Sequence, residues 1–123
     1  MIQEFSFGNF KSFKDINSLN MTAAKIDDLN NKGITNDNKP LLKSKAIYGA
    51  NASGKSNMVK ALVAFLRIIN SSVKNNKIIN LIENYRLSTE TENQPTFFQL
   101  IFQFDDIIYR YGFEATNEKI TSE

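Results

Sequence analysis

The chain has 123 residues, 41% of them hydrophobic, and a formal net charge of +2 at pH 7. This length allows one modest core and therefore one domain. Because the chain contains neither cysteine nor histidine, disulfides, thiolate metal sites and catalysis by a thiol or an imidazole are excluded. A charge so close to neutral neither predicts nor excludes binding to nucleic acid.

Nothing in the sequence indicates an association with membranes. The N-terminal residues lack the basic-then-apolar pattern of a secretory signal, and no apolar run approaches the ~20 residues that a membrane-spanning helix needs. We therefore expect a cytoplasmic protein without a membrane partner.

The first third of the chain predicts two strands and a loop. Apolar residues alternate with polar ones over residues 2–7, a Gly-Asn turn follows, and residues 16–21 predict a return strand. Residues 27–40 are polar, contain glycine and proline and show no sustained period, which predicts a surface loop.

The middle third combines a short apolar run with a helical pattern. Residues 45–48 are mostly apolar, as expected of a buried strand. From Met58 onward, apolar residues recur at intervals of three or four, which predicts an amphipathic helix that ends near residues 71–76. Residues 78–82 form a short apolar segment of undetermined type, and residues 88–95 read as a loop.

The last third predicts a β-hairpin. Residues 96–104 and 107–115 both alternate, and Asp105 and Asp106 between them suit a two-residue turn. An apolar run that ends in two acids also resembles a Walker B segment, whose Asp helps to hold Mg²⁺. We favour the turn, because the alternation resumes directly after Asp106.

Residues 49–56, which we call the phosphate loop, match the pattern G-x-x-x-x-G-K-[ST] in full. Gly49 lets the chain turn sharply, and Gly54 lets backbone N–H groups close around phosphate oxygens. Lys55 is the predicted catalytic cation and would bridge the β- and γ-phosphates of ATP, while Ser56 would ligate Mg²⁺. The start of the following helix adds partial positive charge. The predicted nucleotide contacts are Gly49, Asn51, Ala52, Ser53, Gly54, Lys55, Ser56 and Asn57.

Three stretches carry a family resemblance: residues 1–13, which contain Asn-Phe-Lys-Ser-Phe, residues 46–57 around the phosphate loop, and residues 109–123. On these stretches the chain resembles the N-terminal part of an ABC-type ATPase of the RecF/SMC-like group. It is most similar to the AAA-type prokaryotic ATP-binding proteins related to the OLD and abortive-infection ATPases. Many relatives in the wider ABC class have Gly where Ala52 stands here.

The resemblance implies an α/β fold with a mixed sheet, the first lobe of a P-loop NTPase, built from a strand, the phosphate loop, a helix and an antiparallel hairpin region. Residues 1–123 would form a partial domain, because the second lobe with its Walker B strand and signature sequence is absent. ATP and Mg²⁺ are the implied cofactors, and Lys11 and Ser12 would lie near the nucleotide. The implied partners are the remaining C-terminal lobe and a second copy in an ATP-dependent homodimer.

Three functions stay open at this point. The first is ATP binding by part of a bacterial ABC-type ATPase that hydrolyses ATP when complete, while this chain alone is inactive or very weak. The second is a small P-loop kinase or GTPase that uses Asp105 as its Walker B acid. The third is a regulatory module that binds nucleotide without hydrolysis. DNA or an effector protein as a partner, and a role in phage defence, also stay open.

Overall fold

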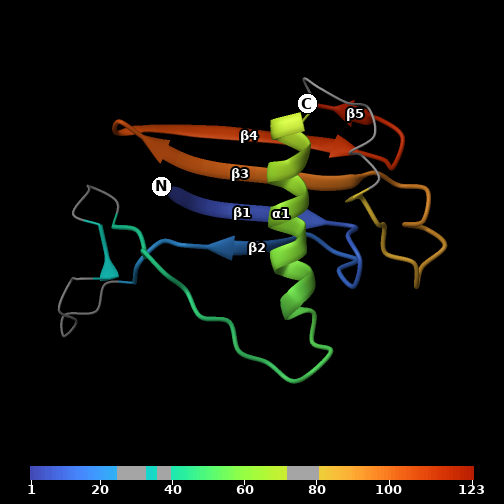
Figure 1. The fold of residues 1–123 in the computed structure, drawn as a ribbon, viewed down its shortest axis with the longest axis horizontal. Helices are drawn as coiled ribbons and strands as arrows, with labels where there is room; N and C mark the ends of the chain where they lie inside the picture. The colour runs from blue at the N-terminus through green and yellow to red at the C-terminus, as the bar shows by residue number, and fades with distance from the viewer. Residues whose placement is uncertain (25–32, 36–39, 72–80) are drawn as a thin grey trace.

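Five strands form one antiparallel sheet in the described part of the chain (Figure 1). A computed structural model describes residues 1–24, 33–35, 40–71 and 81–123. The sheet order is β2-β1-β3-β4-β5, and every neighbouring pair is antiparallel. The elements are β1 (Ile2–Gly8), β2 (Asn17–Asn20), α1 (Lys55–Ser71), β3 (Thr96–Phe104), β4 (Ile107–Ala115) and β5 (Ile120–Ser122).

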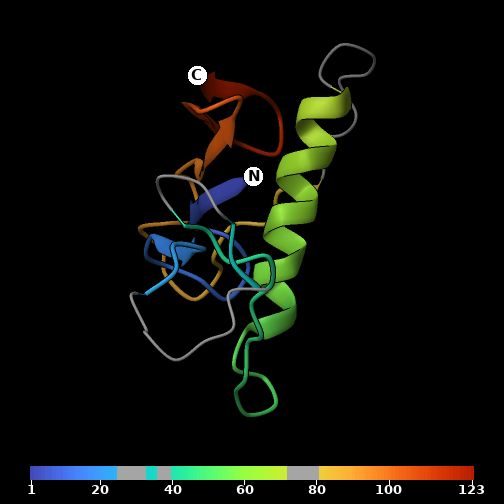
Figure 2. The same ribbon diagram turned by 90° about the vertical axis from the view of Figure 1, so that its left-hand side faces the viewer.

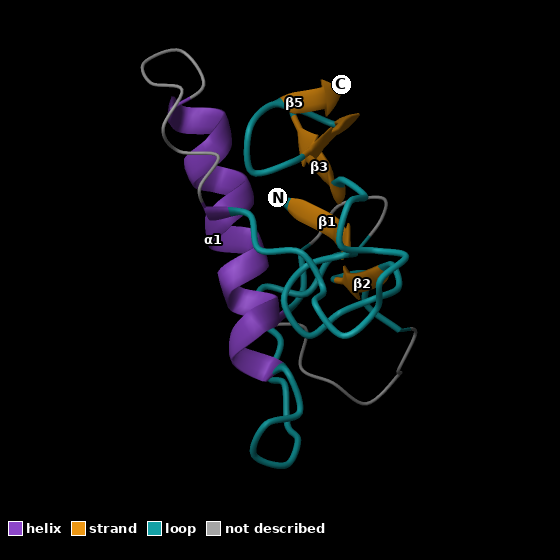
Figure 3. Cartoon of the chain, turned by 90° about the vertical axis from the view of Figure 1, so that its right-hand side faces the viewer, coloured by secondary structure: helices purple, strands orange, loops and turns teal. Residues whose placement is uncertain are grey.

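The strand register gathers phenylalanine side chains on one face of the sheet. Phe7 of β1 lies opposite Phe98 of β3, and Phe98 in turn lies opposite Phe113 of β4. Directly paired residues point to the same face, so the three strands present a continuous aromatic surface. α1 runs across this face, while the other face carries no helix from the described residues (Figures 1 and 3).

α1 forms the second layer of the fold because its apolar residues recur at helical spacing and face the sheet. Ala61, Ala64, Phe65 and Ile68 are all buried, and the two alanines allow the helix to approach the strands closely. The ring of Phe65 stacks on that of Phe113, with centroids 5.5 Å apart. We call the fully packed rings the phenylalanine core: Phe5, Phe7, Phe10, Phe65, Phe98 and Phe113. Burying each ring stabilises the fold by roughly 1.5–3 kcal/mol.

The predicted combination of α and β elements, the N-terminal strand pair, the helix and the C-terminal hairpin are confirmed. The expected mixed sheet is wrong, because every pair of neighbouring strands in the described residues is antiparallel. The hairpin register pairs Phe104 with Ile107, which leaves Asp105 and Asp106 as its two-residue turn. Both turn residues have positive φ, of 47° and 62°. Two positive φ angles match the twist of the flanking strands, and Asp is among the residues that tolerate them.

The expected buried strand at residues 45–48 is wrong. This segment is not part of the sheet, and its apolar residues are exposed, Ile47 by 40% and Tyr48 by 91%. A strand needs a neighbour for its backbone N–H and C=O groups, and no described strand lies alongside this segment. In this segment, the Lys45 ammonium donates a hydrogen bond to the Asn20 carbonyl at 2.8 Å.

The predicted loops are only partly covered. Most of residues 27–40 and of residues 78–82 lie outside the described ranges, although Ile82 is buried and packs against the phenylalanine core. Residues 88–95 form turns, as predicted. Within the described ranges, no helix combines the length and apolar character that crossing a membrane requires.

Candidate phosphate-binding site

The phosphate loop lies at the N-terminal end of α1, beyond the edge of the sheet (Figure 2). Residues 49–53 are exposed, and residues 51–57 line a cavity of about 380 Å³. The lining consists of small and polar residues, with no carboxylate among them. Such a concave surface at a helix start suits an anion, because a helix start carries partial positive charge and N–H groups without an acceptor within the helix. In α1, the N–H groups of Asn57 and Met58 are already bonded to the Gly54 carbonyl.

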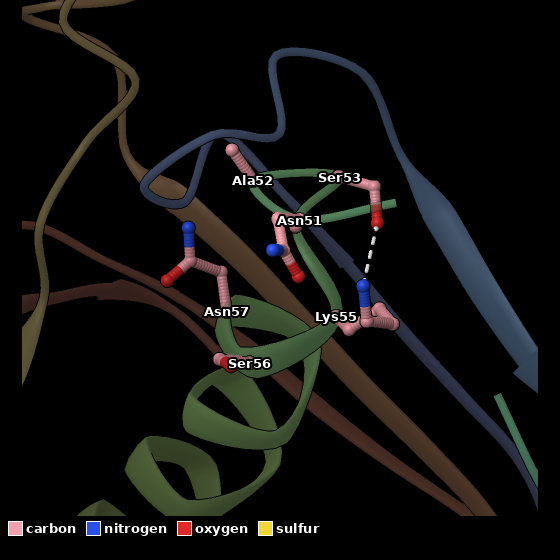
Figure 4. Close-up of a pocket in the computed structure, with 7 residues that line it drawn as sticks. Asn51, Ala52, Ser53, Lys55, Ser56 and Asn57 are labelled. Atoms are coloured by element: carbon pink, nitrogen blue, oxygen red, sulfur yellow. Dashed lines mark hydrogen bonds between the residues drawn. The ribbon is translucent and has the colours of Figure 1, made fainter. Parts of the chain in front are cut away.

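The side chain of Lys55 turns back over the loop (Figure 4). Its ammonium donates hydrogen bonds to the carbonyl oxygens of Gly49, at 2.6 Å, and Ala50, at 2.5 Å, and to the Ser53 hydroxyl at 3.2 Å. These three contacts place a positive charge directly above the loop backbone. The cation is therefore held at the site by the loop itself, within reach of any anion in the cavity.

Two residues in left-handed backbone conformations shape the loop. Gly54 has a φ of +90°, a conformation that glycine adopts without a steric penalty. Its carbonyl oxygen accepts hydrogen bonds from the N–H groups of Asn57 and Met58, which starts α1. Ala52 has a φ of +65° despite its Cβ. Glycine would adopt this φ at position 52 without strain, and Gly is the residue that many members of the wider ABC class have there.

The residues present fit a phosphate group and a magnesium ion in part. The backbone at Lys55 and Ser56 opens the helix, and Ser56 carries an exposed hydroxyl beside it. This set offers N–H donors, one ammonium and one hydroxyl, which suits phosphate oxygens and a single Mg²⁺ ligand. Among the described residues, no group of three acidic side chains is placed to hold a metal ion.

Ser12 lies at this site. The side-chain amide of Asn57 donates a hydrogen bond to the Ser12 hydroxyl at 2.9 Å. In Figure 4, Asn57 accordingly points from the first turn of α1 toward the blue turn that follows β1. The structure therefore brings Ser12 and Asn57 together beside the phosphate loop, and a contact between Ser12 and a nucleotide stays a prediction.

Lys11 points elsewhere. Its ammonium forms an ion pair with Glu83 at 2.6 Å, and its backbone N–H donates to the Glu83 carbonyl at 2.7 Å. Both residues line a different cavity, with Lys60 and Arg67 of α1. The Lys11 hydrogen bond lowers the pKa of Glu83, with added effect from the positive charges of Lys11, Arg86 and Lys60. A contact between Lys11 and a nucleotide stays a prediction, and its ammonium is not among the groups at the loop.

Asp105 and Asp106 lie far from the phosphate loop. They occupy the tip of the β3–β4 hairpin and line a surface hollow with Met1 and Gln103 (Figure 1). The alternative in which Asp105 acts as a Walker B acid is therefore wrong. The physical reason is the register, because both acids are used to reverse the chain between paired strands.

Sequence reasoning assigned no role to Asn9, which organises the surroundings of the site. Its side-chain nitrogen lies 2.9 Å from the Thr91 carbonyl oxygen and 2.8 Å from that of Gln94, and its side-chain oxygen accepts the Tyr85 N–H. Asn9 has a φ of +50° and is buried. A Gly-Asn pair after a strand signals the turn, but nothing local identifies its distant partners.

A protein-family model matches most of the chain. The model described as "AAA domain, putative AbiEii toxin, Type IV TA system" matches residues 46–123, more than half of the chain. The matched range contains the phosphate loop, α1 and the β3–β4 hairpin. Searches of curated proteins and of solved structures gave no match. The likeness to AAA-type ATP-binding proteins is thereby confirmed, and the chain belongs to this AAA-domain family.

Proposed function

We propose that the chain binds ATP through the phosphate loop, which acts as a Walker A loop in an ABC-type ATPase of the RecF/SMC/OLD-like group. The observation that carries this proposal is the position of the Lys55 ammonium above the loop, at the start of α1. Membership of the AAA-domain family supports it independently, because the family match includes the loop.

Each residue of the loop would have a definite task. The backbone N–H groups from residue 51 onward would bind phosphate oxygens, with Gly54 keeping the backbone open for close approach. Lys55 would exchange its neutral carbonyl acceptors for the anionic β- and γ-phosphates, so that both donor and acceptor would carry a charge. Ser56 would ligate Mg²⁺, which neutralises developing phosphate charge when it is bound.

We propose further that this chain alone holds nucleotide without rapid hydrolysis. No carboxylate lines the cavity of the loop, so the lining residues include no acidic group that could activate an attacking water molecule. The missing groups would come from a C-terminal lobe and from an ATP-dependent second copy. Exposed apolar residues on the outer side of α1, namely Val59, Val63 and Leu66, support such a covering element.

Substitution of Lys55 tests the binding site. We expect Lys55→Ala to remove most of the Mg-ATP affinity measured by titration calorimetry, because the cation facing the phosphates is lost. Lys60→Ala is the matched control, since Lys60 is also on α1 and carries the same charge but lies outside the loop cavity. Equal Mg-ATP affinity in the wild type and Lys55→Ala would contradict the assignment.

A separate assay tests the expected lack of turnover. Purified residues 1–123 should release phosphate from Mg-ATP at a rate close to the background rate. Phosphate release well above background that Lys55→Ala abolishes would show that the chain supplies its own catalytic groups. That result would contradict the proposal that this chain alone binds nucleotide without rapid hydrolysis.

A further inference from the structure

The residues Asn9–Phe13 form a compact turn between β1 and β2, which we call the joining turn. The Phe10 and Phe13 backbones close it with two hydrogen bonds, of 3.0 and 2.9 Å. Phe10 is buried in the phenylalanine core, and the ring of Phe13 meets the ring of Phe7 edge-on at 4.9 Å. The side chains of Phe10 and Phe13 therefore attach the turn to the phenylalanine core.

Asn9 fixes the same turn to the chain segment that precedes β3. Its side chain forms hydrogen bonds with the backbone of Tyr85, Thr91 and Gln94. Its backbone carbonyl accepts a hydrogen bond from the buried Thr96 hydroxyl at 2.7 Å. These contacts use both the donor and the acceptor of the amide, so its orientation is determined. Asn9 itself is buried and these bonds are partly buried, so removing the amide would take a partner from the Tyr85 N–H and from the Thr91 carbonyl.

The other end of the joining turn contacts the phosphate loop. A Cβ at Gly54 would lie 3.1 Å from the Phe13 ring and 3.2 Å from the Ser12 hydroxyl, so the turn packs directly against the Gly54 backbone. Asn57 adds its hydrogen bond to Ser12. The preceding residues 49–53 are exposed. Contact with the joining turn thus connects the loop backbone to the sheet, in addition to the packing of α1 on the sheet.

We infer that the joining turn positions the phosphate loop, with Asn9 as its anchor and Phe13 as the surface against which Gly54 rests. Asn9 and Phe13 are positioning residues in this assignment, since they act through Gly54 and α1 and touch no ligand. Only the effect on nucleotide affinity rests on the proposed function. The effect on the loop backbone stands apart from it.

Phe13→Leu is the main test, because leucine keeps an apolar side chain against Phe7 but removes the ring edge that meets Gly54. Phe104→Leu is the matched control, since Phe104 is 64% exposed at the far end of the hairpin. Nuclear magnetic resonance of the isotope-labelled, nucleotide-free chain would follow the backbone amides of residues 52–56. We expect Phe13→Leu to shift these signals and lower their order, and Phe104→Leu to leave them unchanged.

Mg-ATP affinity, measured well below the unfolding temperature, gives the second readout. Phe13→Leu should bind Mg-ATP roughly tenfold to a hundredfold more weakly than the wild type, because small displacements of the groups that contact a ligand lower its affinity. Asn9→Gly keeps the positive φ and should act in the same direction. A folded Phe13→Leu variant with unchanged loop signals would overturn the inference, and so would shifted signals with unchanged affinity. A wild type that binds no Mg-ATP would refute the proposed function, while the loop signals alone still decide the inference.

Discussion

The phenylalanine core and the phosphate loop are built on opposite principles. In the core, six rings from β1, the joining turn, α1, β3 and β4 are almost fully buried, and strand pairing fixes the positions of those in the sheet. In the loop, the first five residues are exposed, and the conformation depends on backbone angles, on bonds within the loop and on the contact of Gly54 with the joining turn. Stability and candidate function therefore reside in different parts of the molecule.

This difference means that mutations should separate the two properties. A core residue contributes through buried apolar area and tight packing, so its loss is felt by the whole fold. A loop residue contributes through local geometry, so its loss should be felt first by a ligand. The following predictions test this separation in order of their expected effect.

Truncation in the core should have the largest effect. Phe65 is 0% exposed and contacts the rings of Phe5, Phe98 and Phe113. We expect Phe65→Ala to lower the free energy of unfolding by about 3–5 kcal/mol, a large share of the total stability of a small domain. Urea denaturation followed by circular dichroism measures this loss. Tyr48→Ala, at a residue 91% exposed, should change the same quantity by less than about 0.5 kcal/mol.

A Cβ at Gly54 should have an intermediate effect on stability and a large effect on binding. The positive φ alone would cost about 1–2 kcal/mol for Ala, and the new methyl group would press on Phe13. We expect Gly54→Ala to lower the unfolding free energy by that amount and to abolish Mg-ATP binding in calorimetry. Gly33→Ala is the control, because a Cβ there meets no atom within 4 Å. If both variants bound Mg-ATP equally, Gly54 would have no special part in the site.

The sequence predicts those features that depend on neighbouring residues. Alternation defined β1, β3 and β4, the helical period defined α1, and two consecutive acids between alternating runs marked the hairpin turn. The phosphate loop was found for the same reason, since its motif is contiguous. Residues 45–48 show the limit, because an apolar run does not reveal whether a neighbouring strand exists to pair with it.

Contacts between distant residues could not be predicted. Lys11 carries the correct charge for a nucleotide contact, yet its ammonium pairs with Glu83, which lies beyond α1 in the sequence. The role of Asn9 was hidden likewise, because its partners Tyr85, Thr91 and Gln94 are brought to it only by the fold. Such contacts leave no local pattern, so a motif can identify a binding loop without identifying what positions it.

The Lys11–Glu83 pair should contribute a small, pH-dependent stability. The folded state lowers the pKa of Glu83, chiefly through the Lys11 hydrogen bond, so the contribution is present above the ordinary glutamate pKa of 4.5 and disappears as the pH falls through the lowered value. The Glu83 side chain is half exposed, so solvent limits the effect to about 0.2–1 kcal/mol. Glu83→Gln should therefore be less stable than the wild type in urea at pH 7, and the difference should vanish in strong acid. A difference that persists in acid would show that the pair is not its source.

The smallest effect concerns the ionisation of Tyr111, at the margin of the core. Its hydroxyl donates a hydrogen bond to the Glu123 carboxylate at 2.5 Å, which together with burial raises its pKa from 10.0 to about 12. The hydrogen bond requires the neutral phenol, so its contribution to stability is complete below pH 10 and is lost as the pH rises through 12.

In a spectrophotometric titration, Glu123→Gln should move the ionisation of Tyr111 back toward its ordinary pKa, whereas Glu118→Gln, at an exposed acid in the β4–β5 turn, should not. Identical titration curves for the wild type and Glu123→Gln would mean that the Glu123 carboxylate is not the source of the raised pKa of Tyr111.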